Sequence, residues 1–242
     1  MLVAVSLLVC PSFAARAAAQ SGDRIVVAIS GGVQGSAPRL TDHFEFERSV
    51  ETATVDVKYP TKPPVLVEGS VTARLWKRLA VGAAVSQAMR SGAAQVDARI
   101  PHPLLFQQPR TVTGAQSGID TAETGIHLQI AYALQATRRI TLTPFGGPSF
   151  LKVGQELVSD VKYDETYPYD TATFSSAPAR RASAGALGFN AGADVRWMFT
   201  HSAGIGGLVR FTRATVNLTS ETRTVPVRAG GMQAAAGLRF VF

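Results

Sequence analysis

Apolar and polar residues alternate with a period of two in several parts of the chain, the pattern of β-strands that have one apolar face. In the stretch 230–242 the apolar face carries Met232, Ala234, Ala236, Leu238, Phe240 and Phe242. In the stretch 184–199 it carries Leu187, Phe189, Ala191, Ala193, Val195, Trp197 and Phe199. The opposite faces of both stretches are small or polar. The chain therefore contains strands whose two faces meet different environments.

The same alternation, with β-branched runs, predicts about eight strands and two kinds of connection between them. We expect strands at 24–34, 65–76, 80–89, 125–136, 140–153, 184–199, 205–212 and 230–242. Short turns fall near Lys77, Arg138 and Thr200. Long polar stretches fall at 35–64, 90–124, 154–181 and 213–228, and we interpret them mostly as loops, with strand extensions in the first left open. Short and long connections thus alternate along the chain.

The first residues read as a targeting segment and not as part of the fold. Leu2 to Val9 form a short apolar run, and Ala17 to Ala19 offer a small-residue cleavage site, as in secretory signal peptides. We therefore expect residues 1–19 to be removed and residues 20–242 to form one domain. The single cysteine, Cys10, lies in the removed part, so disulfides cannot stabilise the mature chain.

Composition favours a membrane barrel over a helical membrane protein. Hydrophobic residues make up 46% of the chain and glycine occurs 22 times. Even so, the mature sequence has no run of about 18 apolar residues that would predict a spanning helix. In a membrane barrel the lipid-facing residues are diluted by lumen-facing ones, one in two.

The net charge indicates which partners the protein could bind, but it says nothing about the fold. The net charge of +7 falls to +6 when Arg16 leaves with the signal peptide. A modest positive excess favours contact with an anionic surface such as lipopolysaccharide. Nucleic acid is excluded as a partner because the chain has no basic run, zinc-ligand spacing or RNA-binding signature.

These features resemble the small eight-stranded outer-membrane β-barrels, the class that includes OmpA, OmpX and OmpW type proteins. The resemblance rests on the terminal GLRFVF with Phe240 and Phe242, on the export signal, and on the hairpin series with its aromatic flanks Trp197, Phe199 and Phe211. It implies an all-β fold: an eight-stranded antiparallel up-and-down transmembrane barrel with short periplasmic turns and long extracellular loops. It also implies a bacterial outer-membrane location and insertion by the barrel-assembly machinery, with the last aromatic strand as the signal. We expect a monomer, although nothing in the sequence fixes the oligomeric state.

If the apolar faces meet lipid, the other faces form a polar lumen. The residues expected there are Glu68, Arg74, His127, Gln129, Asn190, Asp194, Arg196, Arg210 and Arg239. We expect the first strand to pair with the last and close the barrel, and Arg239 to find Asp194 or Glu68 as its partner. Eight strands leave a lumen that side chains can fill, which predicts a plug, with a gated ion path as the alternative.

Candidate chemistry outside the lumen is sparse. His201 and Ser202 are adjacent in a predicted turn where their side chains diverge, and His127 has no serine at matching spacing, so we expect no catalytic residues. The four histidines are scattered, so we expect no metal and no cofactor. Arg110, Arg180 and Arg181 could meet lipopolysaccharide phosphates or simply solubilise the surface.

The sequence leads to a non-enzymatic outer-membrane barrel with an envelope-structural or surface-interaction role. One alternative is a small-molecule transport or binding barrel of the OmpW kind, and a lipid A modifying enzyme is a further one. A soluble, lipocalin-like barrel would instead turn the apolar faces inward. The lining of the lumen distinguishes a plugged barrel from a transporter.

Overall fold

The computed structural model describes residues 25–35, 40–220 and 223–242, and the predicted signal peptide lies outside them. Thirteen β-strands are present in this part. The bounds are β1 Ile25–Gln34, β2 Thr41–Arg48, β3 Glu51–Lys58, β4 Val65–Trp76, β5 Leu79–Ile100, β6 Arg110–Tyr132, β7 Leu134–Gln135, β8 Ile140–Val158, β9 Lys162–Glu165, β10 Ala172–Ser176, β11 Ala179–Met198, β12 Ala203–Ser220 and β13 Arg223–Val241. In the described residues, no helix has the length and apolar character needed to cross a bilayer.

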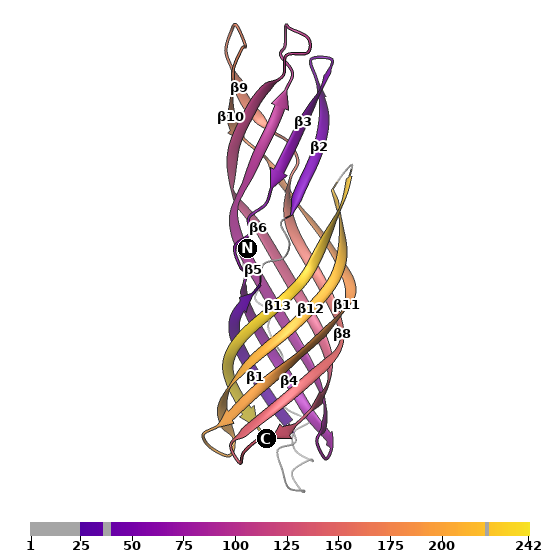
Figure 1. Ribbon diagram of the computed structural model, residues 1–242, viewed down its shortest axis with the longest axis vertical. Coiled ribbons are helices and arrows are strands. Elements are labelled where there is room, and N and C mark those ends of the chain that lie inside the picture. Colours follow the sequence, from indigo (N-terminus) through magenta and orange to yellow (C-terminus); the bar gives the residue numbers. More distant parts are fainter. Residues whose placement is uncertain (1–24, 36–39, 221–222) are drawn as a thin grey trace, which may run out of the picture.

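Eight of these strands close into an antiparallel barrel, as the sequence predicts. The ring runs β1, β4, β5, β6, β8, β11, β12, β13 and returns to β1. The closing pairing joins Val26 to Val241 and Gln34 to Gln233, so the first strand meets the last in the lower barrel. Figure 1 shows the three short turns and the C-terminus at the lower end, and the β2–β3 and β9–β10 hairpins at the upper end.

The stretches interpreted as long loops are mostly strand, which corrects that interpretation. β5 continues to Ile100 and β6 begins at Arg110, so only 101–109 connect them. β12 and β13 together cover nearly all of 213–228. The stretch 35–64 contains the β2–β3 hairpin. β4 pairs with β5 only up to Met89, and above that point β3 takes its place beside residues 95–99 of β5.

Side-chain polarity inverts along the long strands, and this explains the error. In the lower part of β12, Val209 and Phe211 face outward while Arg210 and Thr212 are buried inside. Above them, Ala214, Val216 and Leu218 are buried and Arg213 and Thr215 are exposed. The upper half therefore has a dry apolar core, built also from β3, β5, β6, β8 and β11, like that of a soluble protein.

The lower half carries a continuous set of exposed apolar side chains on its outer surface, which we call the belt. Exposed large apolar side chains lie there on all eight barrel strands, among them Ile29, Val71, Val85, Leu128, Phe150, Leu187, Val209 and Leu238. β1 and β4, with 10 and 12 residues, have the length of a tilted membrane-spanning strand. A lipocalin-like arrangement would bury these side chains, so the belt excludes that alternative and indicates a transmembrane barrel.

Two prolines in β8 are accommodated by a break in one of its two ladders. Pro144 and Pro148 keep their register with β11, opposite Ala193 and Phe189. Toward β6, pairing stops at His127–Ser149 and resumes at Ile130–Gly146. Because proline has no N–H to donate, the ladder is interrupted beside Pro148 and needs another donor there.

Candidate functional site

The lower part of the lumen is crossed by an ion pair between β13 and β11. The guanidinium of Arg239, 2% exposed, donates from Nη2 to Oδ2 of Asp194 at 2.5 Å and from Nε at 3.1 Å. Its Nη1 donates to Ser30 Oγ on β1 at 2.8 Å. Of the two partners expected for Arg239, Asp194 is the one it binds.

The other acidic partner, Glu68, pairs with a different arginine. Arg210 of β12 is fully buried, and its Nη2 lies 2.5 Å from Glu68 Oε2 of β4. The same guanidinium donates to Gln233 Oε1 from Nε at 2.8 Å and from Nη2 at 2.6 Å. Gln233 in turn donates to Gln34 Oε1 at 2.6 Å. Four strands are thereby linked through the lumen.

The network continues to the upper rim of the lumen through Glu123 of β6. Its Oε2 accepts from the backbone N–H of Gly230 at 2.9 Å and from Gln34 Nε2 at 3.4 Å. Gly230 has φ +86°, and a Cβ there would lie 2.4 Å from the carbonyl oxygen of Thr212, so glycine is required. Gly230 lies three residues before Gln233 in β13, and Gln233 is the first residue of β13 that pairs with β1.

A second group of polar side chains surrounds His127 on the lumen face of β5, β6 and β8. Its Nε2 lies 2.9 Å from Ser86 Oγ and its Nδ1 lies 2.8 Å from Ser149 Oγ. The expectation that no serine matches His127 is therefore wrong, because β5 and β8 flank β6 and place one on each side. The ring is 0% exposed, and no carboxylate contacts it in the described structure.

Asn190 supplies the donor missing from the interrupted ladder. Its Nδ2 lies 3.3 Å from Leu128 O, 3.0 Å from Gly147 O, 3.1 Å from Pro148 O and 2.9 Å from Ser149 Oγ. Its Oδ1 accepts from Gln129 Nε2 at 3.3 Å. A lumen side chain thus replaces a backbone hydrogen bond that Pro148 cannot make.

The lumen residues selected from the sequence all face inward. Seven of the nine are buried, while Asp194 and Arg74 are partly exposed, Arg74 lying at the short-turn mouth. Further members of the network are absent from that set, among them Ser30, Gln34, Ser86 and Gln233. Each lies at an inward position of its strand, so the alternation itself would have found them.

The aromatic residues selected from the sequence lie on the outside of the barrel. Trp197 and Phe199 are about half exposed at the short-turn end of the belt, and their rings make an edge contact with centroids 5.0 Å apart. Phe211 contacts Phe189 at the other border of the belt, and Phe242 is the most exposed of the group, with Phe240 half-buried beside it. Their placement is that of interfacial side chains.

The three arginines considered for lipopolysaccharide contact differ in exposure. Arg110 is buried: it donates to Tyr169 O and Pro101 O at 2.9 Å and pairs with Glu165 at 2.6 Å, so its guanidinium is engaged inside the upper half. Arg180 and Arg181 are exposed on β11. Lys152 and Arg213, not selected from the sequence, are exposed at the first outward positions beyond Phe150 and Phe211 of the belt.

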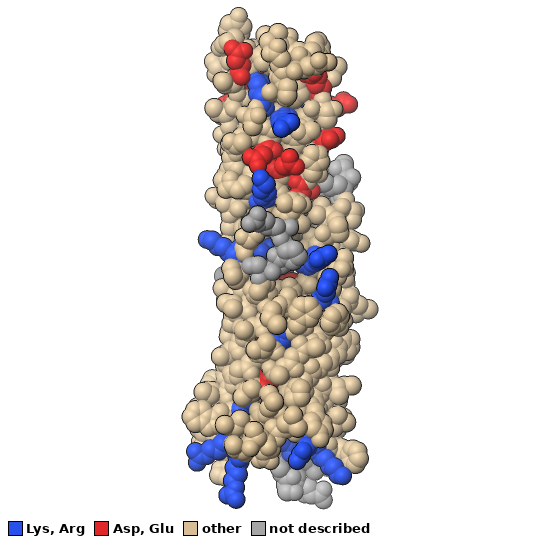
Figure 2. Space-filling view, viewed as in Figure 1, with Lys and Arg blue, Asp and Glu red and all other residues tan. Residues whose placement is uncertain are grey.

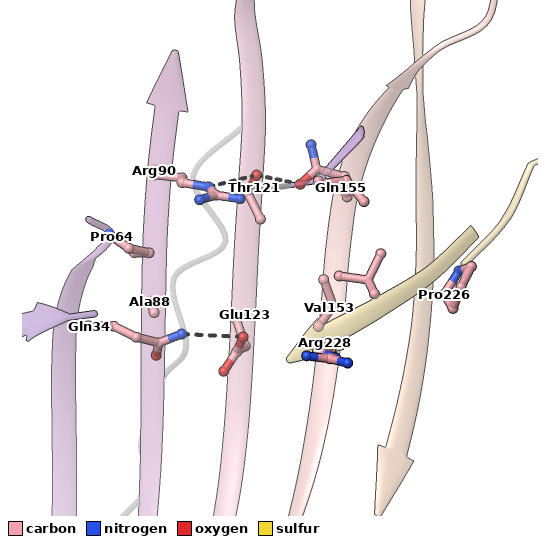
Figure 3. A pocket seen from close by; sticks show the side chains of 12 residues that line it. Gln34, Pro64, Ala88, Arg90, Thr121, Glu123, Val153, Gln155, Pro226 and Arg228 are labelled. Atoms are coloured by element: carbon pink, nitrogen blue, oxygen red, sulfur yellow. Dashed lines mark hydrogen bonds between the residues drawn. The ribbon is translucent and has the colours of Figure 1, made fainter. Parts of the chain in front are cut away.

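A cavity of about 200 Å³ lies above the network, where the polar lumen meets the dry core; we call it the rim cavity. Its apolar lining is Leu40, Pro64, Ala88, Val153, Pro226 and Val227, and its polar lining is Gln34, Arg90, Thr121, Glu123, Gln155 and Arg228. Figure 3 shows Arg90 bonded to Thr121, and Thr121 to Gln155, on one side of it, with Gln34 and Glu123 bonded on another.

Comparison with solved structures finds outer-membrane proteins at low similarity. OprG from Pseudomonas aeruginosa matches with 10% identity and a TM-score of 0.46, over 92% of this chain and 98% of that one. Neisserial surface protein A matches with 12% identity and a TM-score of 0.46, over 92% and 100%. The outer membrane protease OmpT from Escherichia coli matches with 10% identity and a TM-score of 0.48, over 91% and 97%. No protein-family profile and no curated protein sequence matches the chain.

Proposed function

We propose that this chain is a non-enzymatic, non-conducting barrel of the bacterial outer membrane that acts through its rigid outer half, in envelope structure or surface interaction. The observation that supports the proposal is the set of hydrogen-bonded polar side chains that crosses the lumen. Two buried ion pairs, Arg210–Glu68 and Arg239–Asp194, together with the His127 group, occupy the space inside the eight strands. In the proposed orientation the short turns face the periplasm and the extended half faces outward.

The geometry around the histidines supports a non-enzymatic role. His127 contacts two serines and no carboxylate in the described residues, and it does not line the rim cavity or the cavity of about 60 Å³ beside Glu68 and Asp194. His43 contacts Asp56 and Glu45, and the Nδ1 of His102 accepts from the backbone N–H groups of Leu104 and Leu105. A catalytic serine needs a base that substrate can approach, and His127 is enclosed.

Planar-bilayer recording tests the plug directly. We expect no large, stable conductance from the purified barrel, because opposite charges cross the lumen at two levels. The double substitution Glu68→Ala with Arg210→Ala removes the upper pair, and recording it in parallel shows how far the remaining pair, Arg239–Asp194, blocks the lumen alone. Large, stable conductance from the unmodified protein would overturn the proposal.

A second candidate function is binding of a small, mainly apolar molecule, as in the OmpW-like alternative. The specific observation in its favour is the rim cavity, whose apolar lining is joined by the guanidinium of Arg90. Hexanoate, with an apolar chain and one carboxylate, is a suitable probe. Binding would shift the methyl resonances of Val153, and Val153→Trp would fill the cavity and abolish the shift. Unchanged Val153 resonances would eliminate this candidate.

A further inference from the structure

The short-turn mouth of the barrel is a cationic hollow. Arg74, Lys77, Arg78 and Arg196 line a hollow of about 570 Å³ together with Ala133, Gln135 and Thr141. Arg74 and the two turn cations come from the β4–β5 hairpin. Gln135 and Arg196 both lie opposite Thr141 of β8, on β7 and β11, so the lining comes from different sides of the barrel. The hollow is therefore the mouth of the lumen and not a groove on the outer wall.

The lining of the hollow includes no Asp or Glu. The three short-turn hairpins carry no Asp or Glu at all between 69 and 96, between 124 and 155, or between 195 and 220. The two acids deeper in the lumen, Asp194 and Glu68, bind Arg239 and Arg210. Figure 2 shows the outcome on one face: Lys and Arg gather at the lower end, and the Asp and Glu side chains concentrate in the upper half.

Arg196 connects the mouth to the lumen. It is 6% exposed, and it lines both the hollow and a cavity of about 60 Å³ above it, which Glu68, Asp194 and Arg239 also line. The cationic lining thus reaches from the exposed turn residues into the barrel. Cations clustered at a mouth with low-dielectric walls raise the local concentration of anions.

We propose that this hollow binds a phosphate group. Guanidinium forks match the tetrahedral oxygens of phosphate in a bidentate way, and three arginines line the hollow. The Thr141 hydroxyl and the Gln135 amide add neutral donors to the lining. In the proposed orientation the ligand comes from the periplasmic side, either as a phosphate ester in solution or as an anionic phospholipid headgroup of the inner leaflet.

The first experiment uses the whole barrel in dodecyl maltoside, a detergent without phosphate, with inorganic phosphate as the probe. The readout is the side-chain amide resonance of Gln135, with chloride at the same ionic strength as the reference. We expect a saturable shift with phosphate alone. Arg74→Gln with Arg78→Gln should weaken the apparent affinity about tenfold or more, since each removes a charge-assisted hydrogen-bond donor.

A matched control removes the same charge from the same end of the barrel. Arg138 and Arg139 are exposed in the neighbouring turn and do not line the hollow. Arg138→Gln with Arg139→Gln should leave the affinity within about threefold, because distant exposed charges are screened by salt. An unshifted spectrum of the belt residues verifies that both double variants fold.

The second experiment separates the two sources of the phosphate group. In nanodiscs of phosphatidylcholine, added phosphate should shift Gln135 as in detergent if the ligand is a solute. If the ligand is a headgroup, phosphatidylglycerol in the nanodisc should shift Gln135 without added phosphate, and Arg74→Gln with Arg78→Gln should remove that shift. Either result supports the site. The proposal is overturned if Gln135 responds to neither, or if both double variants lose affinity equally.

Discussion

Asn190 Nδ2 lies 3.3 Å from the carbonyl oxygen of Leu128, 62 residues away, beside the point where Pro148 interrupts the β6–β8 ladder. Removal of this donor leaves buried carbonyl groups without a partner. Asn190→Ala should therefore lower the free energy of unfolding by about 1–3 kcal/mol. Urea unfolding in lipid vesicles, followed by tryptophan fluorescence, measures it. Asn217→Ala, on the exposed face of β12, is the control and should be nearly neutral. Equal effects of the two substitutions would contradict the role given to Asn190.

The Arg210–Glu68 pair should show the cost of an unpaired buried charge. Glu68→Ala strands Arg210 and should destabilise the barrel by about 3–5 kcal/mol. Replacing both residues, Glu68→Leu with Arg210→Met, should recover much of the loss. The exposed pair Lys58–Asp97, 3.2 Å apart, gives the comparison: Asp97→Ala should cost less than about 1 kcal/mol. Additive effects of Glu68→Ala and Arg210→Ala in a double-mutant cycle would show that the pair is not coupled.

Gly230 should not tolerate a side chain. With φ +86° and a would-be Cβ 2.4 Å from Thr212 O, Gly230→Ala must shift β13 and so weaken the hydrogen bond to Glu123. We expect a loss of about 1–3 kcal/mol from backbone strain. Gly207, with no atom within 4 Å of a would-be Cβ, is the matched control on β12. If Gly207→Ala and Gly230→Ala unfold at the same urea concentration, the strain argument fails.

His43 should titrate above its ordinary range. Hydrogen bonds to Asp56 at 3.0 Å and Glu45 at 3.5 Å raise the pKa of His43 above 6.5. The contribution of this contact to the β2–β3 hairpin is fully present below pH 6.5 and is lost as pH rises through the raised pKa. NMR titration of the imidazole measures the value. Asp56→Asn should lower it and Glu47→Gln should leave it unchanged; an unaltered pKa in Asp56→Asn would refute the assignment.

Contact with lipopolysaccharide should depend on cations at the outer border of the belt. We propose that Lys152 and Arg213 bind the phosphates of lipopolysaccharide, because an ammonium or a guanidinium favours phosphate. Arg180 and Arg181 contact parts of lipopolysaccharide that lie further from the bilayer. Lys152→Ala with Arg213→Ala should weaken co-purification of lipopolysaccharide more than Arg180→Ala with Arg181→Ala. Arg99→Ala, far above the belt, is the control. Unchanged association in both double variants would leave Arg180 and Arg181 as solubilising charges only.

Much of the barrel could be predicted because, in its lower half, apolar residues that face outward alternate with polar or small residues that face inward. β1 and β4 begin or end where the alternation in the sequence places them, and the aromatic residues from Trp197 to Phe242 face outward as expected. The Arg239–Asp194 pair was one of the two pairings expected for Arg239 from the inward positions of the strands.

The strands of the upper half were not predicted because there the apolar residues face inward and the polar residues face outward. In β12 the even positions change from Arg210 and Thr212 to Val216 and Leu218, and the odd positions change from apolar to polar. A polar outer face and prolines such as Pro226 then read as loop. The His127 group was missed for another reason: its serines come from β5 and β8, and only the register of three strands brings them together.

The inversion of polarity also fixes how deeply the barrel is immersed. If the barrel sank by one pair of residues, Lys152 and Arg213 would enter hydrocarbon, at a cost that grows toward about 2–4 kcal/mol for each at the bilayer midplane. If it rose, Phe150 and Phe211 would leave the lipid for water. β8 and β12 both carry this reversal, so the bilayer holds the barrel at one level while the apolar core above keeps its shape in water.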